Sequence, residues 1–454
     1  MADANTLGLA LSGGGSRAAA FHCGTVAALD ELHLLEKVDV VSTVSGGSVF
    51  GAAWMAARLA GKTTAAFIAS MQTELRRGFV LRSLLSWKVP LLLVPGFRRT
   101  DLIADTFDRV LCGGRTLADL PQAPILCLNA SVLNHGQVGK FSRFGFSTRD
   151  LGKPRLGGGT TAVPMPEFKL ARAAAASAAF PVGLPPLLLG AAELGAAPRA
   201  GLLEGTDPLA LSDGGVLENL GVQTLLKGRR FGTWNIVVSD AGQRDVAWRP
   251  RRPGQWLTAF AIAALSASSL RRVLELMNDK ENRSMRSATV LEAERSWMVE
   301  RIGGATGQTL PEIVRDIRGA EPSRPRRRLF FVRLNQEWDS LLANVPAWRL
   351  RELSRTKDAP VPAGDARAVE TFLETHTEVR LGPARALYRE LGSDLRVAGL
   401  NRVATGFTGL AQRDVDGLAL HARWQLLVQH ALYGAEPGEP SQATPRARMQ
   451  AIPP

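Results

Sequence analysis

The stretch TLGLALSGGGSRAAAFHCGTVAALDELHLLEKVDVVSTVSGGSVFGAAWMAARL, residues 6–59, decides the fold of this chain. Two short apolar and β-branched runs each lead into a cluster of glycines, and a run with helical spacing follows each cluster. This order predicts a β-α-β-α unit of a parallel sheet with helices on both faces. The two glycine loops should lie side by side, because neighbouring parallel strands end at one edge of a sheet. The expected strands are Thr6–Ser12 and Val38–Val44, and the expected helices are Ser16–Leu35 and Ser48–Leu59.

The alternation of strands and helices continues to about residue 335. We therefore expect a mainly parallel α/β domain over residues 1–335, a helical C-terminal extension packed on it over 336–433, and a disordered tail over 434–454. Further strands are predicted at Ile125–Val132, Gly139–Phe146, Trp234–Ser239 and Leu329–Leu334, and further helices at Gln255–Arg301 and Val415–Leu432.

Length and composition favour a large folded core. The chain has 454 residues, of which 45% are hydrophobic and 21% are charged. Cys23, Cys112 and Cys127 lie in apolar surroundings without CxxC spacing, so neither a disulfide framework nor a zinc site is expected. The first residues lack the features of a signal peptide, and no apolar run reaches the roughly 18 residues of a membrane span. These features predict a cytoplasmic protein in a reducing compartment, with peripheral membrane contact.

The charge is strongly basic, with a formal net charge of +13 and a pI near 10.4. Such a balance favours a polyanionic partner, either an anionic bilayer or a nucleic acid. The basic clusters carry no interleaved aromatics and no nucleic-acid-binding motif, so no specific nucleic-acid partner is predicted. Solvated surface arginine is the simpler explanation of clusters that begin at Lys227, Arg249 and Arg324.

Ser45 is the candidate nucleophile. It follows the second predicted strand directly and lies in a variant of the G-x-S-x-G elbow that has Thr43 in place of the first glycine and Gly46 and Gly47 after the serine. Small residues flank such a serine because the turn is tight, and the next helix begins there and stabilises negative charge on the attacking oxygen. The β-branched Thr43 is the departure from the usual motif and raises the question of strain at this elbow. A serine that only caps the helix would give a similar local sequence.

The glycine loop Ser12–Ala18, SGGGSRA, supplies a second part of the candidate site. Gly13, Gly14 and Gly15 leave room for backbone amides to converge on one oxygen atom, as an oxyanion hole requires. Arg17 either guides an anionic phosphate or carboxylate toward these amides or pairs locally on its helix. A dinucleotide-binding loop has a similar glycine pattern, but it needs an acid at the end of the second strand, where this chain has the serine elbow.

Asp213 is the candidate general base. The following Gly214 and Gly215 let the chain turn tightly and point one carboxylate into a cleft. An isolated Asp-Gly-Gly is most often only a turn, so the hypothesis depends on the elbow and the glycine loop as well. A Ser-His-Asp triad would instead need a histidine after the acid, and the candidates are His376, His421 and His430.

These three motifs, in this order, resemble those of the patatin-like phospholipase family over roughly residues 7–335. The resemblance implies a three-layer α/β fold in which amides of the glycine loop form the oxyanion site, Ser45 is the nucleophile and Asp213 is the base. The segments Asn129–Ser131 and Arg172–Pro181 are similar to family segments that pack behind the site. The implied activity is phospholipase A or lysophospholipase cleavage of ester bonds through an acyl-enzyme. The alternatives are a Ser-His-Asp esterase or lipase and a lipid-binding regulatory relative without turnover.

The sequence leaves open how the protein contacts its substrate. Trp87–Phe97, WKVPLLLVPGF, is either a lid or interfacial anchor beside Arg98 and Arg99, or an ordinary buried loop. With an anchor, the expected partner is membrane phospholipid or another acyl lipid at an anionic membrane. The sequence contains no metal-binding cluster, so activity without calcium or a cofactor is expected.

Overall fold

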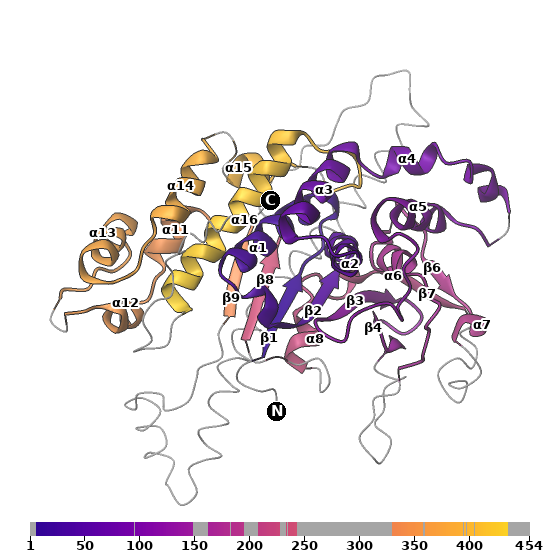
Figure 1. Ribbon diagram of the computed structural model, residues 1–454, viewed down its shortest axis with the longest axis horizontal. Coiled ribbons are helices and arrows are strands. Elements are labelled where there is room, and N and C mark those ends of the chain that lie inside the picture. Colours follow the sequence, from indigo (N-terminus) through magenta and orange to yellow (C-terminus); the bar gives the residue numbers. More distant parts are fainter. Residues whose placement is uncertain are drawn as a thin grey trace, which may run out of the picture.

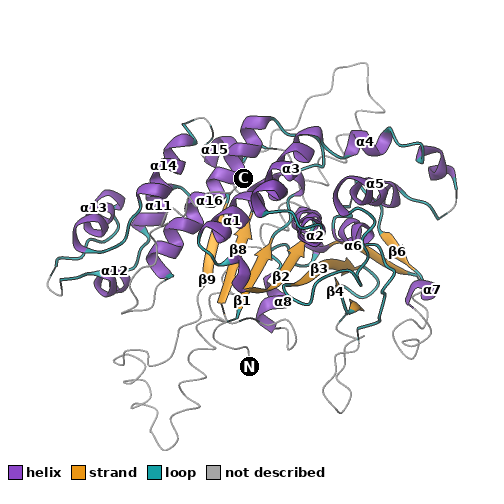
Figure 2. Ribbon diagram, in the orientation of Figure 1, coloured by secondary structure: helices purple, strands orange, loops and turns teal. Residues whose placement is uncertain are grey.

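The computed structural model describes residues 6–94, 96–148, 162–181, 183–194, 208–227, 233, 235–242, 329–356, 359–393, 395, 397–403 and 405–434. Within these residues a central sheet lies between a thick layer of helices on one face and α8 on the other (Figure 1). Figure 2 shows the sheet as one continuous surface beneath the helical layer. The predicted helix Gln255–Arg301 and the predicted tail beyond Gly434 lie outside the described residues.

The sheet has a parallel half and an antiparallel half. Strands β3, β2, β1, β8 and β9 lie side by side in that order and all run parallel, while β4 to β7 are added in antiparallel pairs. The predicted mainly parallel α/β class is confirmed. The strands are β1 (Leu7–Leu11), β2 (Val38–Val44), β3 (Ile125–Val132), β4 (Gln137–Ser142), β5 (Gly145–Ser147), β6 (Leu187–Leu189), β7 (Leu209–Asp213), β8 (Asn235–Asp240) and β9 (Leu329–Arg333).

One strand prediction was wrong. Gly139–Phe146 is not a single strand, because the chain turns between β4 and β5 and pairs Ser142 with Gly145. Gly145, the first residue of β5, has φ +101°, a backbone conformation that glycine adopts readily and that lets the chain reverse direction here. In contrast, β2 and β3 begin and end where the sequence predicted.

Helix α1 (Gly15–Glu31) lies between the sheet and the last helix of the chain and is buried along most of its length. A Cβ on Gly24 would lie 1.8 Å from the carbonyl oxygen of Ala419, so only glycine permits this close helix crossing. The helix ends earlier than predicted, because His33 adopts φ 53°. The other helices before β9 are α2 (Gly46–Leu59), α3 (Thr64–Arg77), α4 (Val80–Leu84), α5 (Arg99–Phe107), α6 (Leu170–Ser177), α7 (Ala191–Leu194) and α8 (Val222–Lys227), and the helical turns are η1 (Leu35–Lys37), η2 (Val89–Leu93), η3 (Asp108–Cys112) and η4 (Gly214–Val216).

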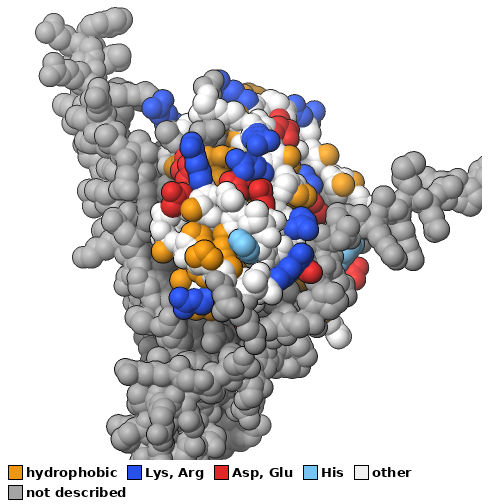
Figure 3. Space-filling view, turned by 90° about the vertical axis from the view of Figure 1, so that its left-hand side faces the viewer, with side chains coloured by type: hydrophobic (Ala, Val, Ile, Leu, Met, Phe, Trp, Pro, Cys, Tyr) orange, Lys and Arg blue, Asp and Glu red, His pale blue; other side chains and the backbone are white. Residues whose placement is uncertain are grey.

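The residues after β9 form helices, as predicted. The last helix, α16, packs against α1, α14 and β9, and its apolar side chains belong to the same hydrophobic core as those of the sheet. The division at residues 335 and 336 therefore stays a prediction. On the face toward the C-terminal helices, basic and acidic side chains are interspersed (Figure 3). These helices are α11 (Trp338–Ala343), α12 (Ala347–Leu353), α13 (Ala366–His376), α14 (Gly382–Glu390), α15 (Val397–Leu400) and α16 (Gln412–Tyr433).

Candidate active site

Ser45 occupies a tight turn between β2 and α2. Its φ of 51° and ψ of −119° are unusual for a residue with a side chain, and such a conformation costs about 1–3 kcal/mol that the surrounding contacts must offset. Those contacts are backbone on backbone: a Cβ on Gly46 would lie 2.2 Å from the Gly15 carbonyl oxygen, and a Cβ on Gly47 would lie 2.4 Å from the Leu11 carbonyl oxygen. Any larger residue at Gly46 or Gly47 would clash with these carbonyl oxygens, so both positions require glycine.

The structure brings Ser45 and Asp213 into direct contact. The Ser45 hydroxyl donates a hydrogen bond of 2.6 Å to Oδ2 of Asp213, although the two residues are 168 positions apart. The other carboxylate oxygen accepts a bond of 2.8 Å from the Gly215 amide. Pairing of Asp213 with Ala130 places the end of β7 beside the elbow. The carboxylate is thus held by the backbone turn and aimed at the serine.

Burial changes the acidity of Asp213. Its carboxylate is 3% exposed, and loss of hydration raises its pKa to about 6, while the bonds from Ser45 and Gly215 partly offset that rise. A carboxylate with such a pKa is still ionised at neutral pH but accepts a proton more readily than an ordinary aspartate. The site therefore holds an oxygen donor and a tuned acceptor at hydrogen-bond distance.

The glycine loop lies against the elbow. The Cβ that Gly13 lacks would be 3.1 Å from the Cβ of Ser45. Among the described residues, no acceptor contacts the amide nitrogens of Gly14 or Gly15, which stand at the start of α1. Helix α2 starts at the neighbouring Gly46, so two helix amino termini, each with partial positive charge, meet beside the serine oxygen.

Arg17 is held inside the protein. Its side chain donates to the carbonyl oxygens of Ala241 at 3.0 Å and Val403 at 3.3 Å, and the residue is 2% exposed. This geometry matches neither alternative, because the guanidinium is buried away from an incoming anion and both partners lie far from its own helix in sequence. The guanidinium ties the start of α1 to the ends of two distant segments.

Thr43 is accommodated without strain at the elbow. It lies in β2, and its hydroxyl bonds to the Ser48 hydroxyl at 2.8 Å and donates to the Cys127 carbonyl oxygen at 3.1 Å. The Thr43 methyl group packs against Gly51, where a Cβ would lie only 2.8 Å from the methyl carbon. Thr43 thus anchors the strand beneath the serine.

Ser177 is a site residue that the sequence did not single out. Its hydroxyl accepts a bond of 3.0 Å from the Ser45 amide and lies 2.7 Å from the Ser48 hydroxyl. It also donates to the Asn129 carbonyl oxygen at 2.5 Å, and the Asn129 side chain donates to the Thr43 carbonyl oxygen at 2.9 Å. The segments that the resemblance placed behind the site therefore supply the polar support of the elbow.

A segment near the C-terminus, Thr405–Gly409, also contacts the glycine loop. A Cβ on Gly15 would lie 1.6 Å from the Thr405 carbonyl oxygen, and the Ser16 amide donates to the Gly406 carbonyl oxygen at 3.4 Å. The Ser16 hydroxyl donates to the Thr408 carbonyl oxygen across 392 positions of sequence. No local pattern reveals such a contact. The C-terminal region therefore forms part of the wall around the candidate site.

Histidines occupy structural positions in the described residues. His22 supports the glycine loop, with Nδ1 2.8 Å from the Ser239 hydroxyl and Nε2 2.9 Å from the Ser12 carbonyl oxygen, and burial lowers its pKa to about 4. His421 bonds through Nε2 to the Leu334 carbonyl oxygen at 2.9 Å, and burial likewise lowers its pKa to about 4. His376 and His430 lie against Phe372 and Phe330, at ring distances of 5.0 and 6.4 Å.

The dinucleotide alternative would need an acidic residue at the end of β2, and Asp39, the acidic residue of that strand, lies near its start. Asp39 accepts a bond of 2.8 Å from the Leu7 amide at the first residue of β1. It therefore lies at the edge of the sheet opposite the glycine loop. In the described part of the chain, no three acidic, histidine or cysteine side chains are grouped so as to hold a metal ion.

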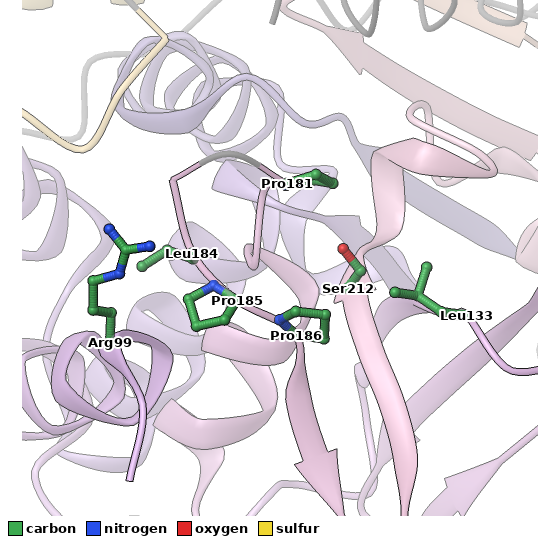
Figure 4. Close-up of a pocket in the computed structure, with 7 residues that line it drawn as sticks. All are labelled: Arg99, Leu133, Pro181, Leu184, Pro185, Pro186 and Ser212. Carbon is green, nitrogen blue, oxygen red and sulfur yellow. The ribbon is translucent and has the colours of Figure 1, made fainter. Parts of the chain in front are cut away.

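A neighbouring cavity of about 300 Å³ opens between the start of α5 and β7 (Figure 4). Ser212, the residue before Asp213, lines it, but neither Ser45 nor Asp213 does. The Ser212 hydroxyl and the Asp213 amide both donate to the Ala179 carbonyl oxygen, at 2.9 and 3.0 Å. The lining is mostly apolar, with one guanidinium, and consists of Arg99, Leu133, Pro181, Leu184, Pro185, Pro186 and Ser212.

The fold and the site define a class: α/β proteins that present a serine at a strand-to-helix elbow, next to a glycine loop and an aspartate. Within that class, the model of the patatin-like phospholipase family matches residues 9–226 of this chain. The match contains the glycine loop, the elbow and Asp213. The resemblance drawn from the three motifs is thereby confirmed.

Solved structures with overall similarity include human GIVD cytosolic phospholipase A2, at 14% identity and a TM-score of 0.44 over 94% of this chain and 60% of that one. VipD from Legionella pneumophila has 16% identity and a TM-score of 0.33 over 85% of this chain and 70% of that one. Both identities and both TM-scores are low, so neither structure informs the site. Among curated protein sequences, none matches this chain significantly. Of the helices described, none combines the length and apolar character needed to cross a bilayer.

Proposed function

We propose that this chain is a lipid acyl hydrolase that uses Ser45 and Asp213 as a catalytic dyad. The observation that carries the proposal is the 2.6 Å hydrogen bond from the Ser45 hydroxyl to a buried carboxylate, at a backbone turn that presents the serine. The family whose model matches residues 9–226 supports an ester of a lipid as the substrate. Phospholipase A or lysophospholipase cleavage is the specific activity we propose.

The proposed reaction begins with attack of the Ser45 oxygen on the acyl carbonyl carbon while Asp213 accepts the hydroxyl proton. The tetrahedral intermediate then carries negative charge on the former carbonyl oxygen. Amides of Gly14 and Gly15 and the amino termini of α1 and α2 would stabilise this charge. Asp213 returns the proton to the leaving alcohol, an acyl-enzyme remains on Ser45, and water activated by Asp213 releases the fatty acid.

The geometry favours a dyad over a Ser-His-Asp triad. In a triad, histidine lies between the serine and the acid, whereas here the Asp213 carboxylate contacts the Ser45 oxygen directly. His421, the most deeply buried of the three candidates, uses Nε2 on a backbone carbonyl and accepts a bond from Trp424 on Nδ1. We therefore expect substitution of these histidines to leave the chemical step intact.

The decisive experiment measures fatty acid release from mixed phospholipid liposomes by the wild type, Ser45→Ala and Asp213→Asn, each shown to be folded by circular dichroism. We expect both substitutions to reduce turnover by at least about a thousandfold, as loss of a nucleophile or its base does in other serine hydrolases. His421→Gln serves as the matched control. Full activity of Ser45→Ala would refute the proposal.

A non-catalytic lipid-binding relative is the alternative from another class. Reaction of Ser45 with a fluorophosphonate probe distinguishes the two, because only an activated serine forms the adduct. We also propose activity without calcium, and loss of turnover on addition of a chelator would contradict it. A cytoplasmic location with peripheral contact to an anionic membrane completes the proposal.

A further inference from the structure

Exposed apolar side chains are concentrated in one stretch, the docking segment Leu81–Val94. Among the described residues, nine large hydrophobic side chains are exposed, and seven of them belong to this segment. Soluble proteins rarely group exposed apolar side chains in this way without a binding role. The alternative of an ordinary buried loop for Trp87–Phe97 is thus wrong, because none of its described residues is buried. The seven are Leu81 at 64%, Leu84 at 57%, Leu85 at 76%, Trp87 at 76%, Leu91 at 36%, Leu93 at 88% and Val94 at 50%.

Polar bonds fix the inner side of the docking segment. The Ser83 hydroxyl donates to the Thr106 hydroxyl on α5 at 2.8 Å, and Lys88 pairs with Asp105 on the same helix. Arg82 pairs with Glu74 on α3. Because these contacts use the polar side chains, the leucines and the tryptophan are left on the outer side. The apolar surface is therefore held in place before any partner binds.

The docking segment is joined to the wall of the active site. Phe79, which directly precedes α4, is fully buried against Phe107 and Phe407, at ring distances of 5.3 and 6.4 Å. Its amide donates to the Phe407 carbonyl oxygen at 2.8 Å. Phe407 belongs to Thr405–Gly409, the segment that contacts the glycine loop. In Figure 1, α4 lies at the rim of the molecule, beyond α5.

Basic side chains predominate around the docking segment, although Arg82 and Lys88 are paired with Glu74 and Asp105 on the flanking helices. Residues 75–100 contain six Lys or Arg residues and no Asp or Glu. Arg98 and Arg99, at the start of α5, form no ion pair with any described acidic residue, and Arg99 also lines the 300 Å³ cavity. This pattern differs from the mixed charge on the face of the C-terminal helices in Figure 3. Exposed leucines and tryptophan beside unpaired arginines match the two layers of an anionic bilayer surface, acyl chains and headgroups.

We infer that the docking segment inserts into the surface of an anionic bilayer and holds the active site against it. The inference rests on the proposed lipid hydrolysis only for the identity of the substrate. Apolar side chains enter the acyl boundary, Arg98 and Arg99 contact headgroup phosphates, and Thr405–Gly409 links the segment to the glycine loop. A lipid drawn from this surface then reaches Ser45 without crossing bulk water.

The test is flotation with vesicles of phosphatidylcholine alone or with phosphatidylglycerol added, using full-length chains that carry Ser45→Ala so that no lipid is consumed. We expect binding to anionic vesicles that weakens as salt rises from 0.1 to 1 M. Joint substitution Leu84→Ser, Leu85→Ser and Trp87→Ser should weaken it by at least about a thousandfold, since each of the three exposed side chains contributes tenfold or more when it inserts. Trp348→Ser, which changes an exposed tryptophan on α12, is the matched control and should bind like the parent.

Turnover of a soluble short-chain ester by chains that retain Ser45 separates docking from chemistry. The triple variant should keep this activity, which also reports that it is folded, and Leu93→Ser gives an independent single change. Equal vesicle binding by parent and triple variant would overturn the inference. So would a concentration-dependent dimer that the triple substitution abolishes while vesicle binding persists, because the surface would then fit a second copy. Vesicle binding without any ester turnover would contradict the proposed function and leave docking supported.

Discussion

The elbow and the docking segment differ in how closely their residues are packed. Around Ser45 the glycines bring backbone against backbone, and Thr43, Ser177 and Asn129 hydrogen-bond one another or the adjacent backbone. In the docking segment large apolar side chains face outward, and Leu93 is 88% exposed. The first region tolerates almost no added atom, whereas the second has free space around its side chains.

This difference separates two kinds of requirement. A reaction requires atoms held at fixed distances, so small changes in the elbow should be costly. A bilayer surface is fluid and has no fixed shape, so docking requires only apolar area and positive charge. We therefore expect substitutions to have large effects on stability at the elbow and small effects in the docking segment.

The largest effect is expected from Gly15→Ala. The new Cβ would meet the Thr405 carbonyl oxygen at 1.6 Å, and φ is +57°, so we expect a loss of about 2–4 kcal/mol in the free energy of unfolding together with loss of ester turnover. Urea denaturation measures the first quantity. Gly113→Ala is the control, since Gly113 has φ +60° and nothing within 4 Å. Equal effects at both glycines would mean that contact with Thr405 is unimportant.

The pH dependence of activity tests the role of Asp213. A base with a pKa of about 6 loses its proton-accepting form tenfold for each pH unit below that value, so kcat/KM at pH 4 should be about a hundredfold below its plateau. Above pH 7 the profile should be flat until another group titrates. A profile that stays flat down to pH 4.5 would exclude Asp213 as the base.

Stability should depend on pH in the opposite sense. The Asp213 pKa is about 6 in the folded chain and 3.8 as the ordinary value, so between these pH values the unfolded chain loses a proton that the folded chain keeps. Stability contributed by this group is complete below pH 3.8 and falls by about 3 kcal/mol as pH rises through 6. Asp213→Asn removes this dependence. Unfolding of both chains at pH 4 and pH 8 measures it, and an unchanged difference between them would contradict the burial argument.

A moderate effect is expected from Ser177→Ala. Its hydroxyl contacts the Ser45 amide, the Ser48 hydroxyl and the Asn129 carbonyl oxygen, so removal leaves buried polar groups unpaired and should cost about 1–3 kcal/mol. Because the Ser45 amide also loses a partner, ester turnover should fall as well. Ser83→Ala, beneath the docking segment, should reduce stability but preserve turnover of a soluble ester. Equal turnover losses would remove the distinction between the two regions.

The smallest effect is expected from Leu85→Ser. This side chain is 76% exposed, so its replacement should change the free energy of unfolding by less than about 0.5 kcal/mol. Thermal denaturation at two protein concentrations checks the value. A loss of 2 kcal/mol or more would show that the Leu85 side chain is buried against other residues in solution, and would contradict the exposure of the docking segment.

The parallel half of the sheet and the three motifs could be predicted because the information is local. Val38–Val44 is a run rich in β-branched residues and Ile125–Val132 is a mostly apolar run, both are bounded by loops, and β2 and β3 match them. The elbow and the glycine loop follow from residues that adjoin these strands. The family match over residues 9–226 is consistent with that local character.

The remainder depends on contacts between distant residues. The split of Gly139–Phe146 into two strands depends on pairing between β4 and β5, and apolar periodicity alone does not reveal it. The exposure of Trp87 depends on which side of α4 finds polar partners on α5. Asp213 reaches Ser45 only because β7 pairs with β3, and Thr405 reaches Gly15 only after nearly the whole chain has folded.

The contact between Thr405–Gly409 and the glycine loop also has a consequence for biosynthesis. Ser16 and Thr408 are 392 positions apart, and at ribosomal rates of 5–20 residues per second this distance corresponds to roughly 20–80 s of translation. During that interval a nascent chain already contains its serine elbow but lacks one wall of the site. The candidate site therefore gains its last wall only after Thr405–Gly409 has been synthesised, and the proposed hydrolysis would begin no earlier than that.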